Sequence, residues 1–305
     1  MKFGILLPIE GNVTDGSPNS KLAIRVAERA EELAFDSVWA GERLLLSPRL
    51  DPISLLGAVA SRTETVRLGT AVIIAPLRSP VLTANQLSSL DNISDGRVIA
   101  GFGVGAERIR SEFENVGVPF NERGKRLDEC IELVKKIWSG EDVSFEGRYY
   151  HVKNLQMKLR PKQRGGPPIF LGGTKNVSIK RIGKLADGWM PLEISPAEYD
   201  STFEKIISSQ RPPVRPLEKA LYITLNISET RESAKKEAQI FVETYYNAKF
   251  PAIEKMAFFG TTKDCISRFE EYASSGVETA IVRFASFRDQ IKEIESFNKE
   301  IASRF

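Results

Sequence analysis

The sequence predicts an α/β fold, a parallel (β/α)8 or TIM barrel, and two observations support this prediction. Short runs rich in apolar and β-branched residues alternate with amphipathic helical patterns along the chain, which favours parallel pairing of the strands. The alternation provides eight strand–helix units in 305 residues. Eight strands close a barrel, whereas an open doubly wound sheet usually has fewer. We therefore expect a single barrel domain spanning residues 1–305.

The first half of the chain contributes four of these units. Each expected strand is a short apolar run, and each helix carries apolar residues at helical spacing. The strands are Phe3–Ile9, Ser37–Ala40, Val66–Ile74 and Val98–Phe102. The helices are Ser20–Ala34 with Ser20 as its cap, one opened by Asp51 and Pro52, one opened by Ser79 and Pro80, and Asn121–Trp138. Proline directly after a capping residue is a typical start of a helix.

The second half continues the pattern after a small insertion. Alternating residues around Glu146 and Gly147 predict a hairpin over Val143–Val152, outside the main repeat. The remaining strands are Ile169–Leu171, Trp189–Leu192, Ala220–Ile227 and Thr279–Phe284. The helices are Val177–Leu185, one capped by Ser195 and Pro196, a long stretch after Ile227, one capped by Thr261 and Thr262 that ends near Gly276, and a last one to Ser303.

Composition narrows the class of protein. The 43 basic and 40 acidic residues nearly cancel and are evenly spread, which argues against nucleic acid as a partner. One histidine, His151, and two distant cysteines, Cys130 and Cys265, offer no metal-ligating motif and fit a reducing cytoplasm. The apolar start is broken at Pro8, too early for a signal peptide, and no run approaches the roughly 18 apolar residues of a membrane helix. We expect a cytoplasmic enzyme or binding protein that acts on a small molecule.

Candidate functional residues lie where barrel strands pass into the loops that follow them. These positions are Pro8, Glu10, Glu42, Arg43, Thr70 to Ile74, Gly103, Gly105, Gly172 to Thr174, Asn226 and Arg283. Two of the clusters are rich in glycine: Gly101 to Gly105 follows strand four, and Gly172 and Gly173 follow strand five at the start of a helix. Glycine lets backbone amides approach a ligand, and a helix N-terminus favours phosphate. The same glycines equally fit crowded turns without a ligand.

The order and spacing of several motifs resemble the bacterial-luciferase-like flavin and deazaflavin oxidoreductases over nearly the whole chain. The motifs are Met1 to Ile5, Asp36 to Glu42, Leu68 to Val72, Asp95 to Val98, Gly101 to Gly105, Arg123 to Glu129, Phe145 to Tyr150, Gly172 to Thr174 and Ala186 to Trp189. The methylene-tetrahydromethanopterin reductase branch is similar at the start and at Gly260 to Cys265. The resemblance implies a barrel that binds coenzyme F420 or FMN without a covalent bond, and a homodimer.

The resemblance also implies roles for particular residues. Gly69, Thr70, Ala71 and Val72 match a bulge in strand three that backs the cofactor ring, often with a non-prolyl cis peptide, here expected between Ala71 and Val72. Gly103, Val104 and Gly105 match a loop near the ring and its ribityl chain. Gly172, Gly173 and Thr174 match the turn that holds the cofactor phosphate. Glu42 matches an acidic position that touches the cofactor in deazaflavin enzymes.

Two positions depart from the family pattern. Arg43 stands where deazaflavin enzymes typically have histidine, and Ala106 stands where they often have a carboxylate. The hairpin residue His151 does not match the missing histidine. Glu42, Arg43 and Arg283 are therefore the catalytic candidates: Glu42 would accept a hydrogen bond from the ring, and an arginine would stabilise developing negative charge. A rim of salt bridges is the structural alternative for these three residues.

Three functions follow from the resemblance. The first is a coenzyme F420-dependent oxidoreductase that transfers a hydride to or from a small organic substrate. The second is an FMN-dependent monooxygenase supplied with reduced FMN by a partner flavin reductase, and the third is a catalytically silent flavin-binding barrel. The loops that would set specificity are Leu44 to Leu50, the loop after strand four, and Asn247 to Phe259.

Overall fold

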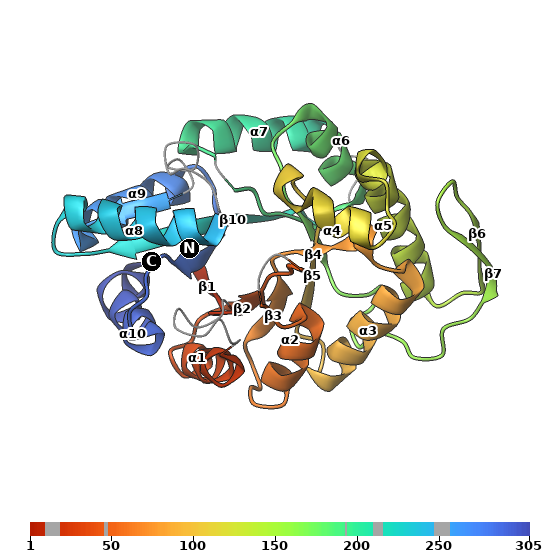
Figure 1. Cartoon of the computed structure of the whole chain (residues 1–305), viewed down its shortest axis with the longest axis horizontal. Coiled ribbons are helices and arrows are strands. Elements are labelled where there is room, and N and C mark those ends of the chain that lie inside the picture. Colours follow the sequence, from red (N-terminus) through yellow and green to blue (C-terminus); the bar gives the residue numbers. More distant parts are fainter. Residues whose placement is uncertain (10–18, 46–47, 193, 210–215, 247–256) are drawn as a thin grey trace. The chain divides into compact units, whose positions relative to one another are not determined.

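The computed structural model describes residues 1–9, 19–45, 48–192, 194–209, 216–246 and 257–305 (Figure 1). The barrel strands are β1 (Lys2–Leu6), β2 (Ser37–Ala40), β3 (Arg67–Thr70), β5 (Val98–Gly103), β8 (Ile169–Leu171), β9 (Gly188–Trp189), β10 (Glu218–Ile227) and β12 (Thr279–Phe284). They hydrogen-bond in the order β12–β1–β2–β3–β5–β8–β9–β10, and β10 pairs with β12 to close the ring. The predicted (β/α)8 barrel is confirmed.

The other strands are short additions to this ring. β4 (Ile73–Ile74) continues the third strand after an interruption and pairs with β5. β11 (Ala257–Gly260), which the sequence analysis missed, pairs with the C-terminal half of β10. β6 (Val143–Glu146) and β7 (His151–Leu155) form a separate antiparallel pair, so the predicted hairpin is confirmed.

The helices follow the strands as expected. The α-helices are α1 (Ser20–Glu32), α2 (Pro52–Ala60), α3 (Pro80–Ile93), α4 (Arg110–Asn115), α5 (Arg123–Ser139), α6 (Asn176–Leu185), α7 (Pro196–Ser208), α8 (Arg231–Tyr246), α9 (Thr262–Ser274) and α10 (Gln290–Glu300). Asp51 caps α2 as predicted, and Ser195 and Thr261 each form a capping box with the acidic residue three positions on. The predicted cap of α1 is wrong by one residue, because the Asn19 side chain accepts the Leu22 amide at 3.0 Å.

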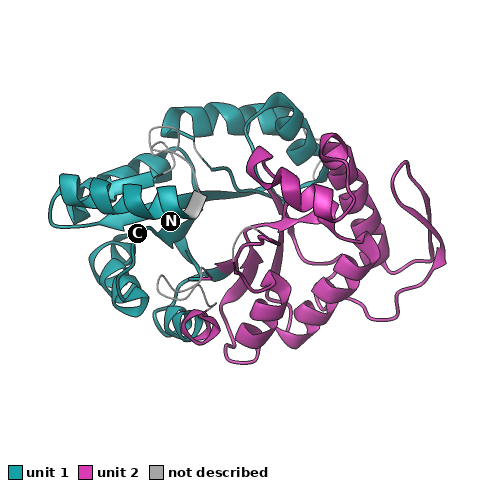
Figure 2. Ribbon diagram, viewed as in Figure 1, with its two compact units in different colours: residues 1–8, 25–38, 172–305 teal, residues 9–24, 39–171 magenta. Residues whose placement is uncertain are grey.

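The chain divides into two compact units, shown in teal and magenta in Figure 2. Unit 1 comprises Met1–Pro8, Arg25–Val38 and Gly172–Phe305, and unit 2 comprises Ile9–Ile24 and Trp39–Leu171. Each unit is built from segments far apart in the sequence. The single domain expected over residues 1–305 stays a prediction.

Unit 1 is centred on a cluster of aromatic rings. The Phe3 ring on β1 meets the rings of Phe269 on α9 and Phe297 on α10 edge to face, with centroids 5.3 and 5.2 Å apart. Phe284 on β12 also contacts Phe297. These contacts fix which face of β1 and β12 looks toward the helices.

In unit 2, the Arg97 side chain holds the start of β5. The Arg97 guanidinium donates to the backbone oxygens of Ala60, Thr63, Val66 and Ser94 and to the Thr63 hydroxyl. The motif Asp95 to Val98 therefore has a structural role here, because Arg97 ties the turn before β5 to the turn before β3.

The two cysteines are buried and free. Burial raises the pKa of both thiols to about 12, so neither is a reactive thiolate near neutral pH. Among the helices that the structure describes, none is both long and apolar enough to cross a membrane.

Candidate active site

The third strand is interrupted between β3 and β4, at the predicted bulge. The peptide bond between Ala71 and Val72 is cis, as predicted. The buried Thr70 hydroxyl donates to the carbonyl of Gly101 and accepts from its amide, both at 2.8 Å. This hydroxyl therefore bridges β3 and β5 at the level where the regular pairing of these two strands stops.

Glycines on both sides of the bulge leave no room for a side chain. A Cβ atom at Gly41 would lie 2.7 Å from the Ala71 carbonyl oxygen, and one at Gly103 would lie 2.4 Å from a Val72 methyl group. Because real Cβ atoms essentially never come this close, the bulge is wedged between the ends of strands two and four. At Gly69, a Cβ atom would overlap the Trp39 ring at 2.1 Å, so that glycine serves packing within the unit.

The Glu42 carboxylate holds this bulge from the end of strand two. It accepts hydrogen bonds from the Ile74 amide at 2.6 Å and from Arg78 Nε at 2.8 Å. Arg78 Nη2 also bonds both Glu42 and Asp51, and the Glu42 amide donates to the Val72 carbonyl at 3.2 Å. We call Glu42, Arg78 and Asp51 the bulge clamp. In this clamp, Glu42 forms an ion pair with Arg78, which was not among the predicted site residues.

Burial sets the electrostatics of the clamp. The Glu42 side chain is 6% exposed, and this burial raises its pKa against the opposing hydrogen bonds from Arg78. For the more accessible Asp51, burial opposes ionisation, but hydrogen bonds from Arg78 and Ser54 lower the pKa. Glu42 is therefore a largely buried charge, and its ion pair is with Arg78.

A second buried carboxylate connects the loops after strands two and four. The two oxygens of Glu112, on α4, accept the backbone amides of Leu44 and Leu45 at 3.1 Å each. Glu112 is fully buried. Glu112 was not among the predicted site residues, because the periodic pattern of this six-residue helix is too short to distinguish it from a loop.

The glycine-rich loop after β5 is closely packed at Gly105. Gly105 has φ +81°, a conformation that favours glycine, and a Cβ atom there would lie 2.7 Å from the Phe113 ring. Phe113 belongs to a buried cluster with Ile74, Ile109 and Phe120. The cluster joins the end of the bulge to the loop that contains Gly103, Val104 and Gly105.

In unit 1, the turn of Gly172, Gly173 and Thr174 leads into α6 as predicted. Gly173 has φ +105°, and its carbonyl accepts the Trp189 indole N–H at 3.1 Å. The capping position, Lys175, makes no side-chain cap to the helix, and the first turn contains no acidic residue. Backbone amides at the start of α6 thus point toward this turn without a capping side chain from Lys175.

Arg283 also belongs to unit 1, and it is 4% exposed. Its guanidinium lies 5.3 Å from the centre of the Tyr222 ring. Glu42 and the partly exposed Arg43 belong to unit 2. The structure thus describes Arg283 as a buried side chain, and the grouping of these three residues stays a prediction.

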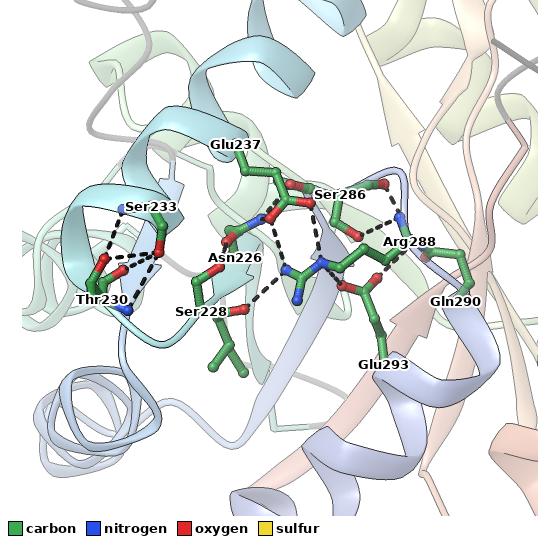
Figure 3. Close-up of polar contacts among 11 residues, drawn as sticks. Asn226, Ser228, Thr230, Ser233, Glu237, Ser286, Arg288, Gln290 and Glu293 are labelled. Carbon is green, nitrogen blue, oxygen red and sulfur yellow. Dashed lines mark hydrogen bonds and ion pairs between the residues drawn. The ribbon is translucent and has the colours of Figure 1, made fainter.

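A polar network holds the loop that follows β12, near the C-terminal ends of β10 and β12 (Figure 3). The buried Asn226 amide donates to the Ala285 carbonyl at 2.8 Å and to Glu237 at 3.0 Å. Arg288 pairs with Glu237 at 3.0 Å and Glu293 at 3.4 Å and donates to the Ile227 carbonyl. Of this network, only Asn226 was a predicted site residue, because the other members come from α8, from the loop after β12 and from α10.

The lone histidine and the acidic residue next to Ala106 are both exposed. His151 lies on the hairpin, and its side chain is 59% exposed. Glu107, next to Ala106, is exposed and paired with Arg110 at 2.7 Å. Among the described residues, no three His, Cys, Asp or Glu side chains form a group that could hold a metal ion. Glu10, positions 46–47 of the loop after strand two, and 247–256 of the later loop lie outside the described residues.

Comparison with known proteins identifies the family. Residues 1–279 match the luciferase-like monooxygenase family, and the chain belongs to it. The fold is that of monooxygenase RslO1 from Streptomyces bottropensis, with a TM-score of 0.82, 24% identity, and 100% and 99% of the two chains covered.

Two named relatives are similar in sequence. An F420-dependent glucose-6-phosphate dehydrogenase of Microbacterium testaceum is 33% identical over 57% of this chain and 52% of its own length. A 5,10-methylenetetrahydromethanopterin reductase of Archaeoglobus fulgidus is 23% identical over 89% and 92%. The chain spans about half the length of the curated relatives that it matches above 30% identity.

We predict that Arg78→Met destabilises the protein by about 3–5 kcal/mol at about pH 7, because it leaves the buried Glu42 carboxylate without its counter-charge. The loss should be smaller at about pH 5. Without Arg78, burial holds the pKa of Glu42 even further above its unfolded value, so the folded state takes up a proton and gains stability as the pH falls. Urea denaturation at both pH values measures this difference.

The matched control is Arg110→Met, which removes an exposed arginine from an ion pair with Glu107. It should change stability by less than about 1 kcal/mol at either pH. Equal effects of the two substitutions would contradict the structural role of the bulge clamp.

Glu112→Gln should speed hydrogen exchange of the Leu44 and Leu45 amides by at least about tenfold, or about 1.4 kcal/mol, because one amide loses its carboxylate acceptor. Exchange measured by mass spectrometry should be unchanged in β5. Glu114→Gln, an exposed change on the same helix, is the control. A uniform rise over the whole chain would show that Glu112 supports general stability instead.

Proposed function

We propose that this protein is a coenzyme F420-dependent oxidoreductase that transfers a hydride to or from a carbon atom of a small organic substrate. The observation that carries the proposal is the clamped third-strand bulge between Gly41 and Gly103 in a member of the luciferase-like family. The F420-dependent relatives from Microbacterium testaceum and Archaeoglobus fulgidus support the choice of cofactor.

The residues around the bulge fit a flat ring. Gly69, Thr70, Ala71 and Val72 form a short stretch whose shape is fixed on both sides, by the glycines and by the clamp. Its own side chains near the interruption are small or aliphatic. A surface of this kind suits van der Waals contact with a planar heterocycle and offers it no competing charge. We infer that Gly103 and Val104 contribute to the same surface and that Gly105 fixes the course of the loop.

The start of α6 fits a phosphate. Gly172 and Gly173 bring the backbone close, the helix dipole favours an anion there, and Lys175 adds a positive charge. A Cβ atom at Gly172 would lie 2.9 Å from the Met190 carbonyl oxygen, and one at Gly173 would lie 2.7 Å from the Ser178 hydroxyl. Both glycines are thus required by the turn itself, so substituting them would test packing as well as binding.

A bound deazaflavin supplies the hydride chemistry, and the protein orients it. In this chain, the bulge would support the ring, and the turn before α6 would hold the phosphate. Glu42 acts through the position of the bulge, because its carboxylate is bound to Ile74 and Arg78. Arg43 would supply positive charge that stabilises an anionic reacting group, and it stays protonated throughout. A reaction that needs little proton transfer by the protein fits this set of residues.

The alternative is an FMN-dependent monooxygenase that works with a flavin reductase. The family name and the same bulge and phosphate turn support it. The two candidates differ in the cofactor that the apoprotein binds. Titration with coenzyme F420 and with FMN, followed by fluorescence, should show tighter binding of coenzyme F420. Tighter binding of reduced FMN, with oxygen uptake, would favour the alternative, and binding without any turnover on a substrate panel would favour a silent barrel.

Asn176→Asp, at the first position of α6, should weaken binding of the cofactor by at least about tenfold, or about 1.4 kcal/mol, because the new carboxylate repels the phosphate. The substitution keeps the side-chain shape, and a negative charge at a helix N-terminus is favourable, so the melting temperature should not fall. The control is Asn121→Asp, an exposed position just before α5. Equal affinities for the two variants would refute the phosphate site.

A further inference from the structure

We propose that Thr224 and Arg283 form a subsite for a negatively charged oxygen of the substrate, a carboxylate or a phosphate. The inference rests on the proposed function and adds the class of substrate. It starts from the buried Thr224 hydroxyl on β10, which has no hydrogen-bond partner among the described residues. A buried hydroxyl without a partner is unfavourable, and most such groups in folded proteins are satisfied.

The register of the strands places Thr224 beside Arg283. In the parallel pairing of β10 with β12, Thr224 is the direct partner of Arg283. Paired residues of neighbouring strands point to the same face of the sheet, with strands about 5 Å apart. The hydroxyl and the guanidinium are therefore neighbours on one face.

That face is the interior of the barrel. Phe3 on β1 and Phe284 on β12 contact Phe297 on α10, so these two side chains point toward the helices. Side chains alternate along a strand, so Arg283 points to the opposite face, and Thr224 points with it. In a (β/α)8 barrel, the face away from the helices is the interior.

Both residues lie toward the functional end of their strands. Arg283 is the second-last residue of β12, and Thr224 is followed on the same face of β10 by Asn226. Active sites of these barrels lie at the C-terminal ends of the strands. The Asn226 amide already bonds Glu237 and the Ala285 carbonyl, so the next available donor on this face is the Thr224 hydroxyl.

The chemistry of the pair favours an oxyanion. Arg283 is a permanent cation that is buried beside the Tyr222 ring. The Thr224 hydroxyl can donate a hydrogen bond to an oxygen that also meets the guanidinium. Hydrogen bonds between such donors and a charged oxygen are stronger than those to a neutral one. The subsite would thus select substrates that carry a carboxylate or phosphate near the reacting carbon.

The test uses Thr224→Val, which removes the hydroxyl and keeps the shape. Calorimetry on the cofactor-loaded and cofactor-free protein would use four probes: lactate, 2-propanol, glucose 6-phosphate and glucose. We expect one charged probe to bind at least tenfold tighter than its neutral counterpart, and Thr224→Val to remove that advantage. Thr224→Ser should restore it, and Arg283→Lys should weaken it.

Thr83→Val is the matched control, because Thr83 on α3 is also a buried threonine whose hydroxyl has no partner among the described residues. Both valine variants should keep or raise the melting temperature, but only Thr224→Val should change binding. Equal affinity for charged and neutral probes, or unchanged affinity in Thr224→Val, overturns the subsite. Weaker binding of the cofactor itself in Thr224→Val also overturns it, since the cofactor would then be the occupant.

The same measurements separate this inference from the proposed function. If the wild-type protein binds neither cofactor, the proposed function fails, and the probe titrations of the cofactor-free protein still decide the subsite. If the cofactor binds and the charged probes have no advantage, the subsite alone fails.

Discussion

The interruption of the third strand is the constraint on which the described part of unit 2 depends. Where β3 stops and β4 begins, the chain gives up regular pairing, and other groups must take over the backbone's hydrogen bonds. Thr70 does so on the side of β5, and Glu42 does so on the side of strand two. Glycines at 41 and 103 are the consequence, because the Ala71 carbonyl oxygen and a Val72 methyl group occupy the space that their side chains would need.

Buried carboxylates perform most of this positioning. Glu42 accepts the amide of Ile74 in β4, and Glu112 accepts two amides of the loop after β2, so buried charge orders the backbone where regular strand pairing is interrupted or ends. A buried carboxylate forms strong hydrogen bonds, but it destabilises the folded state when it has no counter-charge. Arg78 provides this counter-charge for Glu42. In unit 1, the network around Asn226 and Arg288 has the same task for the loop after strand eight. We regard these groups as support for the site.

The proposed chemistry follows from what the chain offers at the strand ends. Arg43 stands where the family resemblance implies a histidine, and the lone histidine of the chain, His151, is exposed on the hairpin. Arginine stabilises charge and does not transfer protons, so hydride transfer to or from a substrate held by its charged oxygen suits these residues. The proposed oxyanion subsite and the proposed cofactor site thus both rely on fixed charge instead of proton transfer by the protein. The two proposals are argued from different residues.

The sequence by itself determined the features that depend on local periodicity and on residue type. Alternating patterns predicted eight strands and their helices, β2, β8 and β12 to the residue, and glycine marked the crowded turns. Local patterns did not reveal β11 or α4, which are short, or the cap Asn19. Only the tertiary structure decided that Glu42 pairs with Arg78, 36 residues away, and that Arg283 lies beside Thr224. Such partners follow from the register of strands and the course of loops, and these depend on the packing of the whole chain rather than on neighbouring residues.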